Sequence, residues 1–395
     1  MIKYVMPTEW VKYDQSAVLA YLTEAKAAVL SLTTIPYQKS WAEKLQNIQL
    51  KREVAGTSRI EGADFTEGEL DAALKDSPEE LFTRSQRQAR AAKNTYLWIA
   101  NLPDDYPINA DLILETHRRI VTGADDDHCP PGQIRKKDNN VNFGFPRHRG
   151  AEGGRECEKV FARLDQVVQH ELKEHDPLIQ ALALHYHFAS IHPFLDGNGR
   201  TARALEALFL QRAGLRDTLF IAMSNYYYDE KSGYLASLSA ARASQHDLTP
   251  FLIFGLKGIA LQCNRLFREI RTHVCKAMFR NIMYDLFNRL ATTRKRVIAE
   301  RQVELLKVLL ELDEIELNEL YGKTVRVYQK LSNVQKAFFR DLNNLIEMGA
   351  IFARKNGTDR WLIAPNLDWP TQITESEFFK IVSQMPKAKT HSFLS

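Results

Sequence analysis

Apolar residues recur at three- and four-residue spacing along most of the chain. The spacing is clear at Val18, Tyr21, Leu22 and Ala25, and it returns between residues 182 and 189. Because an α-helix completes one turn every 3.6 residues, such positions line a single helical face that a core can cover. The pattern therefore predicts a mainly α-helical fold.

Strand signals are confined to two places, residues 134–145 and residues 351–363. The first lies within residues 122–154, which are crowded with Gly, Pro and charged residues. Long loops of this kind are often binding loops or lids, and the alternative is a disordered insertion. An ordered hairpin is favoured by four side chains that can anchor it: Ile134, Val141, Phe143 and Phe145.

The second strand signal follows two helical patterns, at residues 303–312 and 334–348, and contains an Asn356-Gly357 turn. Helices followed by an Asn-Gly hairpin are typical of a winged-helix module. In the helix over residues 334–348, the side chains predicted to face the core are Val334, Ala337, Phe338, Leu342, Leu345 and Ile346. Those predicted to point outward are Lys336, Arg340 and Asn344.

Composition adds limits to this picture. The 395 residues suggest two or three domains, and a content of 45% hydrophobic and 26% charged residues excludes a disordered or low-complexity chain. The four cysteines show no metal-binding spacing, which favours a reducing compartment. Apolar stretches are too short to span a bilayer, and the first residues lack the apolar core of a signal peptide. We expect a cytoplasmic protein with no membrane contact.

Charge is unevenly distributed along the chain. The formal net charge is +4, and the segment from Arg265 to Lys307 holds eleven Lys/Arg against four Asp/Glu. Such a segment is either the solvated face of a long helix or a nucleic-acid patch. Residues 311–365 hold eight Lys/Arg and eight Asp/Glu, so the winged-helix-like module has no positive field of its own. That balance favours protein contact or a structural role over DNA binding, which stays open.

The candidate chemistry lies in residues 185–203, HYHFASIHPFLDGNGRTAR. Pro193 disfavours helical geometry in the residue before it, so His192 is expected at a helix end, where it can act as a proton acceptor. The Gly197-Asn198-Gly199 loop can point backbone N–H groups at an anion. Arg200 and Arg203 share a helical face and can hold separate phosphates.

Asp196 supplies a hard oxygen ligand suited to a magnesium ion that bridges phosphates. Each of these residues has a plain structural alternative, such as a core histidine or a helix-capping aspartate. A zinc site at His185, His187 and His192 is disfavoured, because residues two apart on a helix face different ways. No Walker-type GxxxxGK segment occurs. The combination within twelve residues is what indicates a nucleotide site.

The string HPFLDGNGRTAR, from His192 to Arg203, matches the Fic-family signature His-x-Phe-x-Asp/Glu-Gly-Asn-Gly-Arg-x-x-Arg at every defined position. The chain thus resembles the Fic family, and the resemblance implies AMP transfer from ATP to a protein hydroxyl. It implies that His192 is the general base, that Phe194 anchors the loop and that Asp196 holds Mg²⁺. The ATP-binding residues that it implies are Gly197, Asn198, Gly199, Arg200, Thr201, Ala202 and Arg203.

A second resemblance lies upstream, where residues 57–62, TSRIEG, match the family's inhibitory pattern Ser/Thr-x-x-x-Glu-Gly/Asn. The residues carried over are Thr57, Glu61 and Gly62. Gly62 reads as a helix C-cap, which leaves Glu61 in the last turn, where the helix dipole disfavours a carboxylate. The resemblance implies that Glu61 pairs with Arg203 and blocks productive ATP binding. A solvated glutamate before a helix stop is the plain alternative.

Two further segments resemble family elements. Residues 131–135, PGQIR, are similar to the start of the family's flap hairpin, which aligns the target chain by strand addition. The exposed edge that this implies comprises Asn140, Val141, Asn142, Phe143 and Gly144. Tyr234 and Leu235 fall in a segment similar to the family's adenosine-side Tyr-Tyr-x-x-Leu, with Leu235 in place of the second tyrosine.

Taken together, these patterns predict a Fic-type helical core with a small β-hairpin flap and a C-terminal winged-helix-like domain. The predicted regions are an N-terminal helical region with the inhibitory helix (1–115), the catalytic core (116–258), a basic helical connector (259–300) and the winged-helix-like domain with a tail (301–395).

The predicted function is that of a magnesium-dependent protein adenylyltransferase that uses ATP, modifies a Ser, Thr or Tyr hydroxyl and is autoinhibited by Glu61. The partner would be an unknown target protein, the chain itself included, and a homodimer is compatible. Removal of AMP by the same site is a related hypothesis, and transfer of another phosphate-containing group is a third. The alternative from another class is a DNA-binding transcriptional regulator whose Fic-like domain senses nucleotide.

Overall fold

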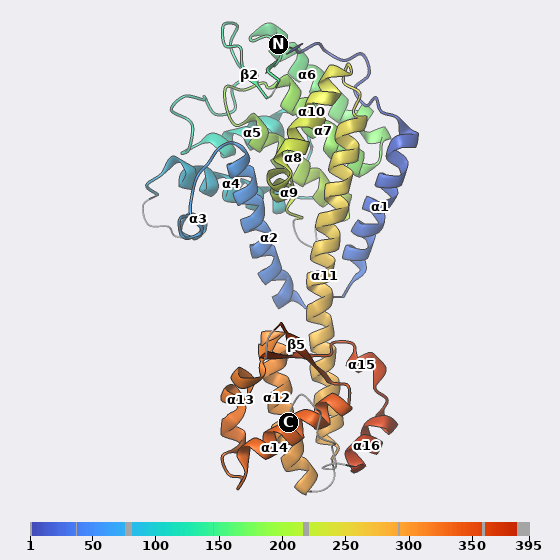
Figure 1. Cartoon of the computed structure of the whole chain (residues 1–395). Coiled ribbons are helices and arrows are strands. Elements are labelled where there is room, and N and C mark those ends of the chain that lie inside the picture. Colours follow the sequence, from blue (N-terminus) through green and yellow to red (C-terminus); the bar gives the residue numbers. More distant parts are fainter. Residues whose placement is uncertain are drawn as a thin grey trace. The chain divides into compact units, whose positions relative to one another are not determined.

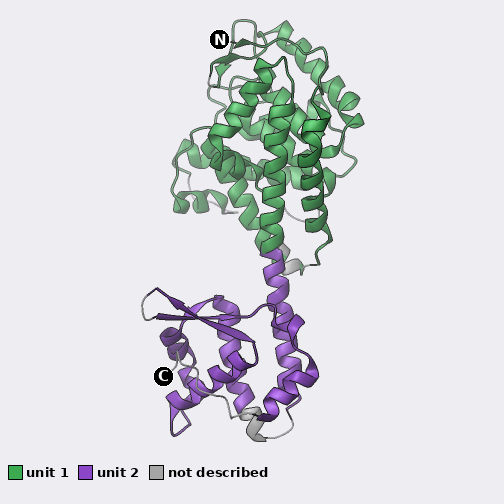
Figure 2. Ribbon diagram, turned by 45° about the vertical axis from the view of Figure 1, so that its right-hand side comes forward, with its two compact units in different colours: residues 1–268 green, residues 269–395 purple. Residues whose placement is uncertain are grey.

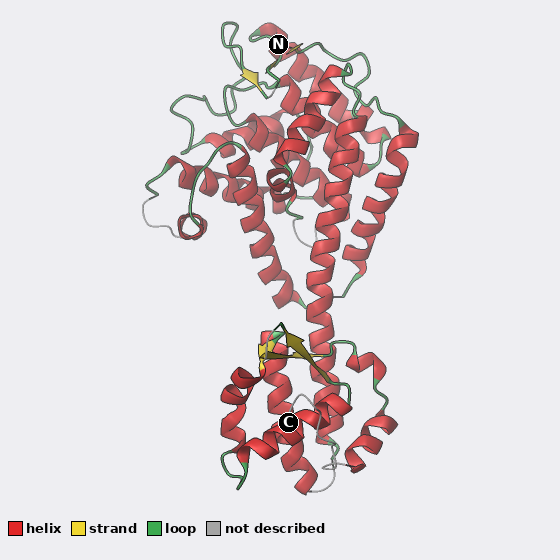
Figure 3. Ribbon diagram, in the orientation of Figure 1, coloured by secondary structure: helices red, strands yellow, loops and turns green. Residues whose placement is uncertain are grey.

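The computed structural model describes residues 2–36, 38–75, 81–144, 146–215, 221–290, 293–357 and 360–384, without the side chains of residues 39, 40, 42 and 293–297. The chain divides into two compact units, residues 1–268 and 269–395 (Figure 2). The division falls inside the long helix α11 (Thr249–Asn288), which covers most of the predicted connector. Helices dominate both units (Figure 3), which confirms the predicted fold class.

The first unit is built around two adjoining helices, α7 (Pro177–Ile191) and α8 (Asn198–Leu210). Nearly every side chain of α7 is buried, which is the property of a helix that is surrounded on all sides. The helix α8 packs against α7, α5, α4 and α2 (Figure 1). The other helices of this unit are α1 (Gln15–Thr34), α2 (Lys39–Ile60), α3 (Glu67–Leu74), α4 (Arg84–Ala100), α5 (Ala110–Val121), α6 (Arg155–Gln169), η1 (Glu171–Glu174), η2 (Gln211–Leu215), α9 (Met223–Asp229) and α10 (Lys231–Ala243).

Local sequence signals set the ends of the helices that matter for the site. Asp176 caps α7 by accepting from the Leu178 amide at 3.0 Å, and Pro177 occupies the first turn, where its missing N–H costs nothing. A capping box of Thr83 and Gln86 begins α4. Gly62, with φ +92°, follows the last residues of α2 in the left-handed conformation that ends many helices.

The predicted hairpin is present but shorter and shifted. Strand β2 (Asn142–Phe143) pairs antiparallel with β3 (His148–Arg149), and β1 (Ile2–Lys3) adds to the other side of β3 in parallel. Residues 134–141 form no strand, and Phe145 lies outside the described residues. The reason is that the Arg135 backbone and side chain bond to the loop after α7 instead of to a strand partner. The pairing of β1 carried no signal in the sequence.

After the C-terminal part of α11, the described residues of the second unit form a helix, a strand, three helices and a β-hairpin in sequence, followed by two short helices. These elements are α12 (Thr293–Leu312), β4 (Ile315–Glu316), α13 (Leu317–Thr324), η3 (Val325–Tyr328), α14 (Val334–Glu347), β5 (Ile351–Asn356), β6 (Arg360–Pro365), α15 (Trp369–Gln372) and α16 (Glu375–Gln384). The three strands form a sheet in the order β4-β6-β5. This order is compatible with a winged-helix-like module, which stays a prediction.

The predicted faces of α14 need one correction. Ala337, Phe338, Leu342 and Leu345 are buried as expected, and Val334 and Ile346 are half-buried and pack against the same core. Asn344, predicted to point outward, is 1% exposed. The cause is that α12, η3 and β5 all pack against α14, so its covered surface is wider than one apolar stripe. Lys336 is exposed and Arg340 is half-buried.

None of the helices in the described part of the chain is long and apolar enough to cross a membrane.

Candidate functional site

His192 lies at the C-terminal end of α7, as Pro193 predicts, and takes the left-handed conformation with φ 53° and ψ 60°. Its Nδ1 lies 3.1 Å from the Ala189 carbonyl oxygen, which can only accept a hydrogen bond. The ring must therefore carry its proton on Nδ1, and Nε2 keeps a lone pair. Burial lowers the pKa of His192 to about 4. The side chain is thus a neutral proton acceptor at pH 7.

The loop after His192 is held from inside by its own side chains. Phe194 is fully buried, and the Asn198 amide bonds both to the Phe194 N–H and to its carbonyl, each at 2.9 Å. Gly197 has φ +73°, and a Cβ there would lie 2.8 Å from Val121, so only glycine fits. This turn starts α8, whose first N–H groups lack carbonyl partners within the helix.

His117 on α5 supports the same loop and was not found from the sequence. Its ring stacks on Phe194 with centroids 3.6 Å apart, and its two nitrogens bond to the Gly132 amide (2.9 Å) and the Asp196 carbonyl (3.1 Å). Burial lowers the pKa of His117 to about 4, so the ring is neutral, with one donor and one acceptor as these contacts require. His117 had no neighbouring motif that could have revealed it.

Arg135 ties the flap segment to the loop. Its Nε donates to the His192 carbonyl at 2.8 Å, and its Nη2 donates to the Ala151 carbonyl at 2.6 Å. The Phe143 ring from β2 stacks on the His192 imidazole, with centroids 4.0 Å apart and planes 9° apart. Arg242 lies over the Phe143 ring at 4.8 Å. The edge strand β2 therefore lies beside the proton acceptor.

Arg203 contacts the end of α2, as the resemblance implied. Its Nη2 lies 2.7 Å from Glu61 Oε1, and its guanidinium also donates to the Thr57 hydroxyl (2.9 Å) and carbonyl (3.1 Å). Burial opposes ionisation of Glu61, but the charge of Arg203 outweighs it and holds the Glu61 pKa below its usual value. A Cβ added to Gly199 would lie 2.1 Å from Glu61 Oε1. The carboxylate therefore lies against the first turn of α8.

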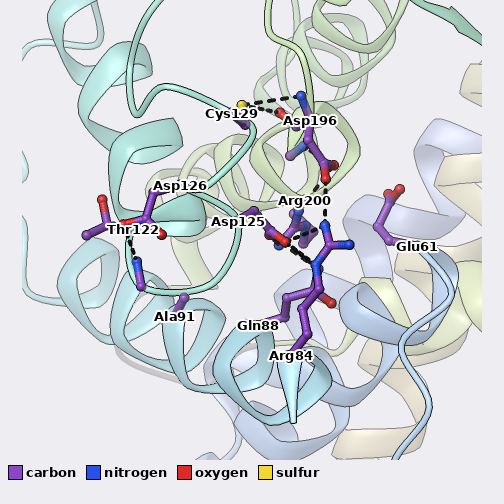
Figure 4. Close-up of polar contacts among 12 residues, drawn as sticks. Glu61, Arg84, Gln88, Ala91, Thr122, Asp125, Asp126, Cys129, Asp196 and Arg200 are labelled. Atoms are coloured by element: carbon purple, nitrogen blue, oxygen red, sulfur yellow. Dashed lines mark hydrogen bonds and ion pairs between the residues drawn. The ribbon is translucent and has the colours of Figure 1, made fainter.

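Arg200 has different partners (Figure 4). Its Nη1 lies 2.6 Å from the fully buried Asp125 carboxylate and its Nη2 lies 3.3 Å from Asp196. Arg84, from the first turn of α4, bonds to the same two carboxylates. Gln88 also donates to Asp125, at 2.9 Å. The sequence offered no sign of this cluster, because Asp125 stands in a run of three aspartates that looks like a solvated loop.

Three residues, Asp196 among them, could hold a metal ion. The ligand atoms of Asp125, His128 and Asp196 lie within 4.8 Å of one another. Asp125 is engaged by Arg84, Gln88 and Arg200, whereas the Asp196 side chain is 31% exposed. Burial alone would raise the pKa of Asp196, but a hydrogen bond from His128 and the charge of Arg200 hold it below the usual value. One ionised, accessible carboxylate is what Mg²⁺ takes from a protein when phosphates and water supply its other ligands.

A pocket of about 220 Å³ joins several of the predicted residues. Those that line it are Glu61, Phe143, Gly144, His192, Gly199, Arg203, Tyr234 and Leu235. Thr201 and Ala202 are fully buried and are not among the residues that line it. Of the predicted flap edge, only Asn142 and Phe143 form strand; Asn140, Val141 and Gly144 flank it.

Comparison with known proteins agrees with this geometry. Residues 107–210 match the model of the Fic/DOC family. Protein adenylyltransferase fic-1 of Caenorhabditis elegans is 31% identical over 169 residues, which are 42% of this chain and 30% of that protein. The Caenorhabditis briggsae protein of the same name is 29% identical over 43% of this chain and 31% of its own length. The chain thus matches about a third of the length of these relatives.

Two solved structures share the fold. A Fic family protein from Desulfovibrio desulfuricans G20 superposes with a TM-score of 0.56 at 20% identity, covering 92% of this chain and 99% of that one. Fic-1 of C. elegans superposes with a TM-score of 0.54 at 22% identity, covering 66% and 74%. Residues 107–210 are therefore similar to the Fic/DOC family, within a fold that these two solved structures share.

Proposed function

We propose that this protein transfers AMP from ATP to a hydroxyl group of a protein. The observation that carries the proposal is the juxtaposition of a neutral His192, an edge strand and an anion-binding helix N-terminus around one pocket. The name protein adenylyltransferase of the matched relatives supports it. The three features correspond to the proton acceptor, the target-binding edge and the phosphate site that such a reaction needs.

The proposed step is an in-line displacement at the α-phosphorus. His192 Nε2 accepts the proton of the target hydroxyl, whose oxygen forms a bond to the α-phosphorus. The bond from the α-phosphorus to the bridging oxygen of the β-phosphate breaks, and pyrophosphate leaves. The N–H groups at the start of α8 and the guanidinium of Arg203 stabilise the negative charge of the phosphates. Strand addition at β2 would hold the target hydroxyl near His192.

Asp196 is the residue that would hold Mg²⁺, since its carboxylate is ionised and accessible. Mg²⁺ held at Asp196 would offset the negative charge of the phosphates. Arg84 and His128 now share this carboxylate at 3.1 and 3.0 Å, so their contacts would loosen when it binds metal.

We also infer that Glu61 inhibits the reaction. Its carboxylate holds the place of an anion at Gly199 and engages Arg203, so outer phosphates and Glu61 compete for the same partners. Lys231 donates to the Ile60 carbonyl at 2.9 Å and helps to hold the end of α2 in this position. The inhibition is released when the Glu61 carboxylate leaves Arg203, either by substitution or by withdrawal of the end of α2 from α8.

The experiment that tests both proposals is intact-mass measurement after incubation with ATP and Mg²⁺. We expect a one-AMP mass gain that is at least about tenfold greater in Glu61→Gly than in the wild type, because an anion competitor is removed. The double variant Glu61→Gly with His192→Ala should show none. Equal gain in the double variant would remove His192 as the base, and equal gain in the wild type would remove Glu61 as the inhibitor.

Several finer points stay predictions. These are the choice of a Ser, Thr or Tyr hydroxyl, self-modification, homodimer formation and a cytoplasmic location. Removal of AMP by the same site also stays a prediction; loss of AMP release from a purified modified target in Glu61→Gly would support it.

The DNA-binding alternative likewise stays a prediction. The burial of Asn344 and the 3.5 Å contact between Arg340 and Asp341 leave Lys336 as the exposed cation of the predicted outward set on α14. A gel shift in which Lys336→Ala with Arg340→Ala weakens binding and flattens its salt dependence would support this alternative.

A further inference from the structure

A line of buried polar side chains leads from the interior of the first unit to Arg203. Glu206 on α8 bonds to His185 Nδ1 on α7, and His185 Nε2 lies 2.8 Å from the Tyr234 hydroxyl on α10. The Tyr234 oxygen lies 3.5 Å from Arg203 Nη1. Glu206 and His185 are 1% and 0% exposed, and Tyr234 is 3% exposed. Buried polar groups of this kind are held in fixed geometry when each has its partner.

The donors and acceptors in this line have one consistent direction. The Glu206 carboxylate also accepts from the Tyr227 hydroxyl, at 2.9 Å, so it acts as an acceptor toward His185 Nδ1–H. His185 Nε2 then accepts the Tyr234 O–H hydrogen. The Tyr234 oxygen is left with lone pairs that face Arg203, whose N–H groups can only donate. Burial raises the pKa of Tyr234 to about 12, so the hydroxyl keeps its hydrogen.

The Tyr234 ring is fixed as well as its hydroxyl. It stacks on Tyr227 with centroids 4.6 Å apart and planes 21° apart. The His185 ring meets Tyr227 and Phe251 edge-on at 5.4 and 5.2 Å. These contacts leave the Tyr234 oxygen little freedom to leave the position beside Arg203.

The hydrogen-bond partners of Arg203 differ in whether they stay beside it when the inhibition is released. Thr57 lies in the last turn of α2 and Glu61 directly follows this helix, so both contacts are lost when this segment withdraws. Among the hydrogen bonds of Arg203 with described residues, Tyr234 is the partner that lies outside α2. The guanidinium is now drawn to Glu61 at 2.7 Å, and its contact to Tyr234 is stretched. Loss of Glu61 removes the pull on Nη2, and withdrawal of Thr57 as well would free the guanidinium to close on the Tyr234 oxygen.

We propose that Tyr234, oriented by His185 and Glu206, is the positioning residue that keeps Arg203 directed at the outer phosphates of a nucleotide once α2 withdraws. This inference rests on the proposed function and names a determinant of its substrate class, a nucleoside polyphosphate. It assigns the Tyr234 hydroxyl to the phosphate end of the pocket. The family resemblance instead implied that Tyr234 lies on the adenosine side of the nucleotide site.

The test is calorimetric binding of ATP and of AMP to full-length Glu61→Gly and to the same chain with Tyr234→Phe. Removing one hydrogen bond to a charged group should weaken ATP binding roughly tenfold. AMP has no outer phosphates, so its affinity should stay unchanged. Tyr186→Phe is the matched control, because Tyr186 is also fully buried and its hydroxyl bonds to His246 at 2.8 Å, away from this line. It should alter neither affinity.

A second pair of variants tests the orienting role of His185. His185→Phe removes the acceptor for the Tyr234 hydrogen and should also lower the ratio of ATP to AMP affinity. His187→Phe is its control, since His187 lies on the same helix, is 1% exposed and bonds to the Trp10 carbonyl instead. Thermal melts of both variants report any loss of stability that the two changes share.

The inference is overturned if Tyr234→Phe binds ATP as tightly as its parent, or if it loses ATP and AMP affinity to the same extent. Its failure is distinct from failure of the proposed function. A Glu61→Gly chain could bind ATP more tightly than AMP, with the Tyr234 dependence described, and still transfer no AMP. That result would support this inference and overturn the proposed transferase function.

Discussion

Arg200 and Arg203 lie three residues apart on α8, yet their surroundings differ in one decisive way. Arg200 pairs with Asp125, and both side chains are buried, at 1% and 0% exposure. Arg203 is equally buried, but its carboxylate partner Glu61 is 33% exposed and belongs to α2. Arg200 therefore has its counter-charge within residues 107–210, the matched Fic/DOC segment, whereas the counter-charge of Arg203 comes from outside it.

The difference separates a structural ion pair from an exchangeable one. A buried guanidinium whose buried carboxylate is removed has no access to water, so the loss is large. A guanidinium whose partner lies at an accessible helix end can exchange that partner for another anion, such as a phosphate. The same residue type on the same helix thus has two uses, and the following variants test the separation.

The largest expected effect is on stability. Asp125→Asn leaves Arg200 and Arg84 without their shared buried carboxylate, and it should lower the free energy of unfolding by about 3–5 kcal/mol. Glu61→Gly should change it by no more than about 1 kcal/mol, because Glu61 is a third exposed. Urea denaturation measures both. Asp126→Asn, at an exposed neighbour, is the control. Equal losses for Asp125→Asn and Glu61→Gly would break the comparison.

The next effect is the pH dependence of AMP transfer, which reports the pKa of His192 in its buried position. Because burial lowers the pKa of His192 to about 4, its neutral form persists well below the ordinary histidine pKa of about 6.5. AMP transfer by Glu61→Gly should stay level from about pH 8 to pH 5 and fall as the pH approaches 4. Initial rates give the profile, with circular dichroism at each pH to confirm folding. A midpoint near 6.5 would show that His192 is not buried as described.

The smallest expected effect is on the strength of inhibition. Thr57→Val removes the hydroxyl that accepts from Arg203 Nε at 2.9 Å, so it should loosen the end of α2 and raise AMP transfer by a factor of about five. Ser58→Ala is the matched control, since the neighbouring Ser58 is fully buried and its hydroxyl has no partner within the described part of the chain. If both variants behave alike, the Thr57 contact does not contribute to inhibition.

How far the sequence could predict the site depends on whether the relevant contacts are local. The end of α7 at His192, the glycine turn at Gly197 and the helix stop at Gly62 all follow from backbone preferences of a few neighbouring residues. The helical class follows from periodicity. Glu61 and Arg203 are 142 positions apart in the sequence, so no local rule could predict that they pair. That prediction came from the family resemblance alone.

The residues that sequence reasoning missed hold the site through long-range contacts. Asp125 lies in the run Asp125-Asp126-Asp127, and nothing local marks which of the three is buried. His117 and His185 look like ordinary helix residues until tertiary packing brings their partners close. The outward assignment of Asn344 was wrong because three elements pack against α14, and a single apolar stripe cannot show that. Periodicity predicts one buried face of a helix, but it does not predict how many other elements pack against that helix.

The left-handed backbone of His192 carries a consequence for natural variation at this position. A side chain in that conformation costs about 1 kcal/mol relative to glycine, which adopts it freely. Stability alone would therefore favour glycine at the end of α7, whereas the proposed proton transfer needs an imidazole there. A chain of this fold with glycine at position 192 would keep the helix end but lack the proposed proton acceptor. The residue at this position therefore distinguishes chains that can carry out the proposed reaction from chains that cannot.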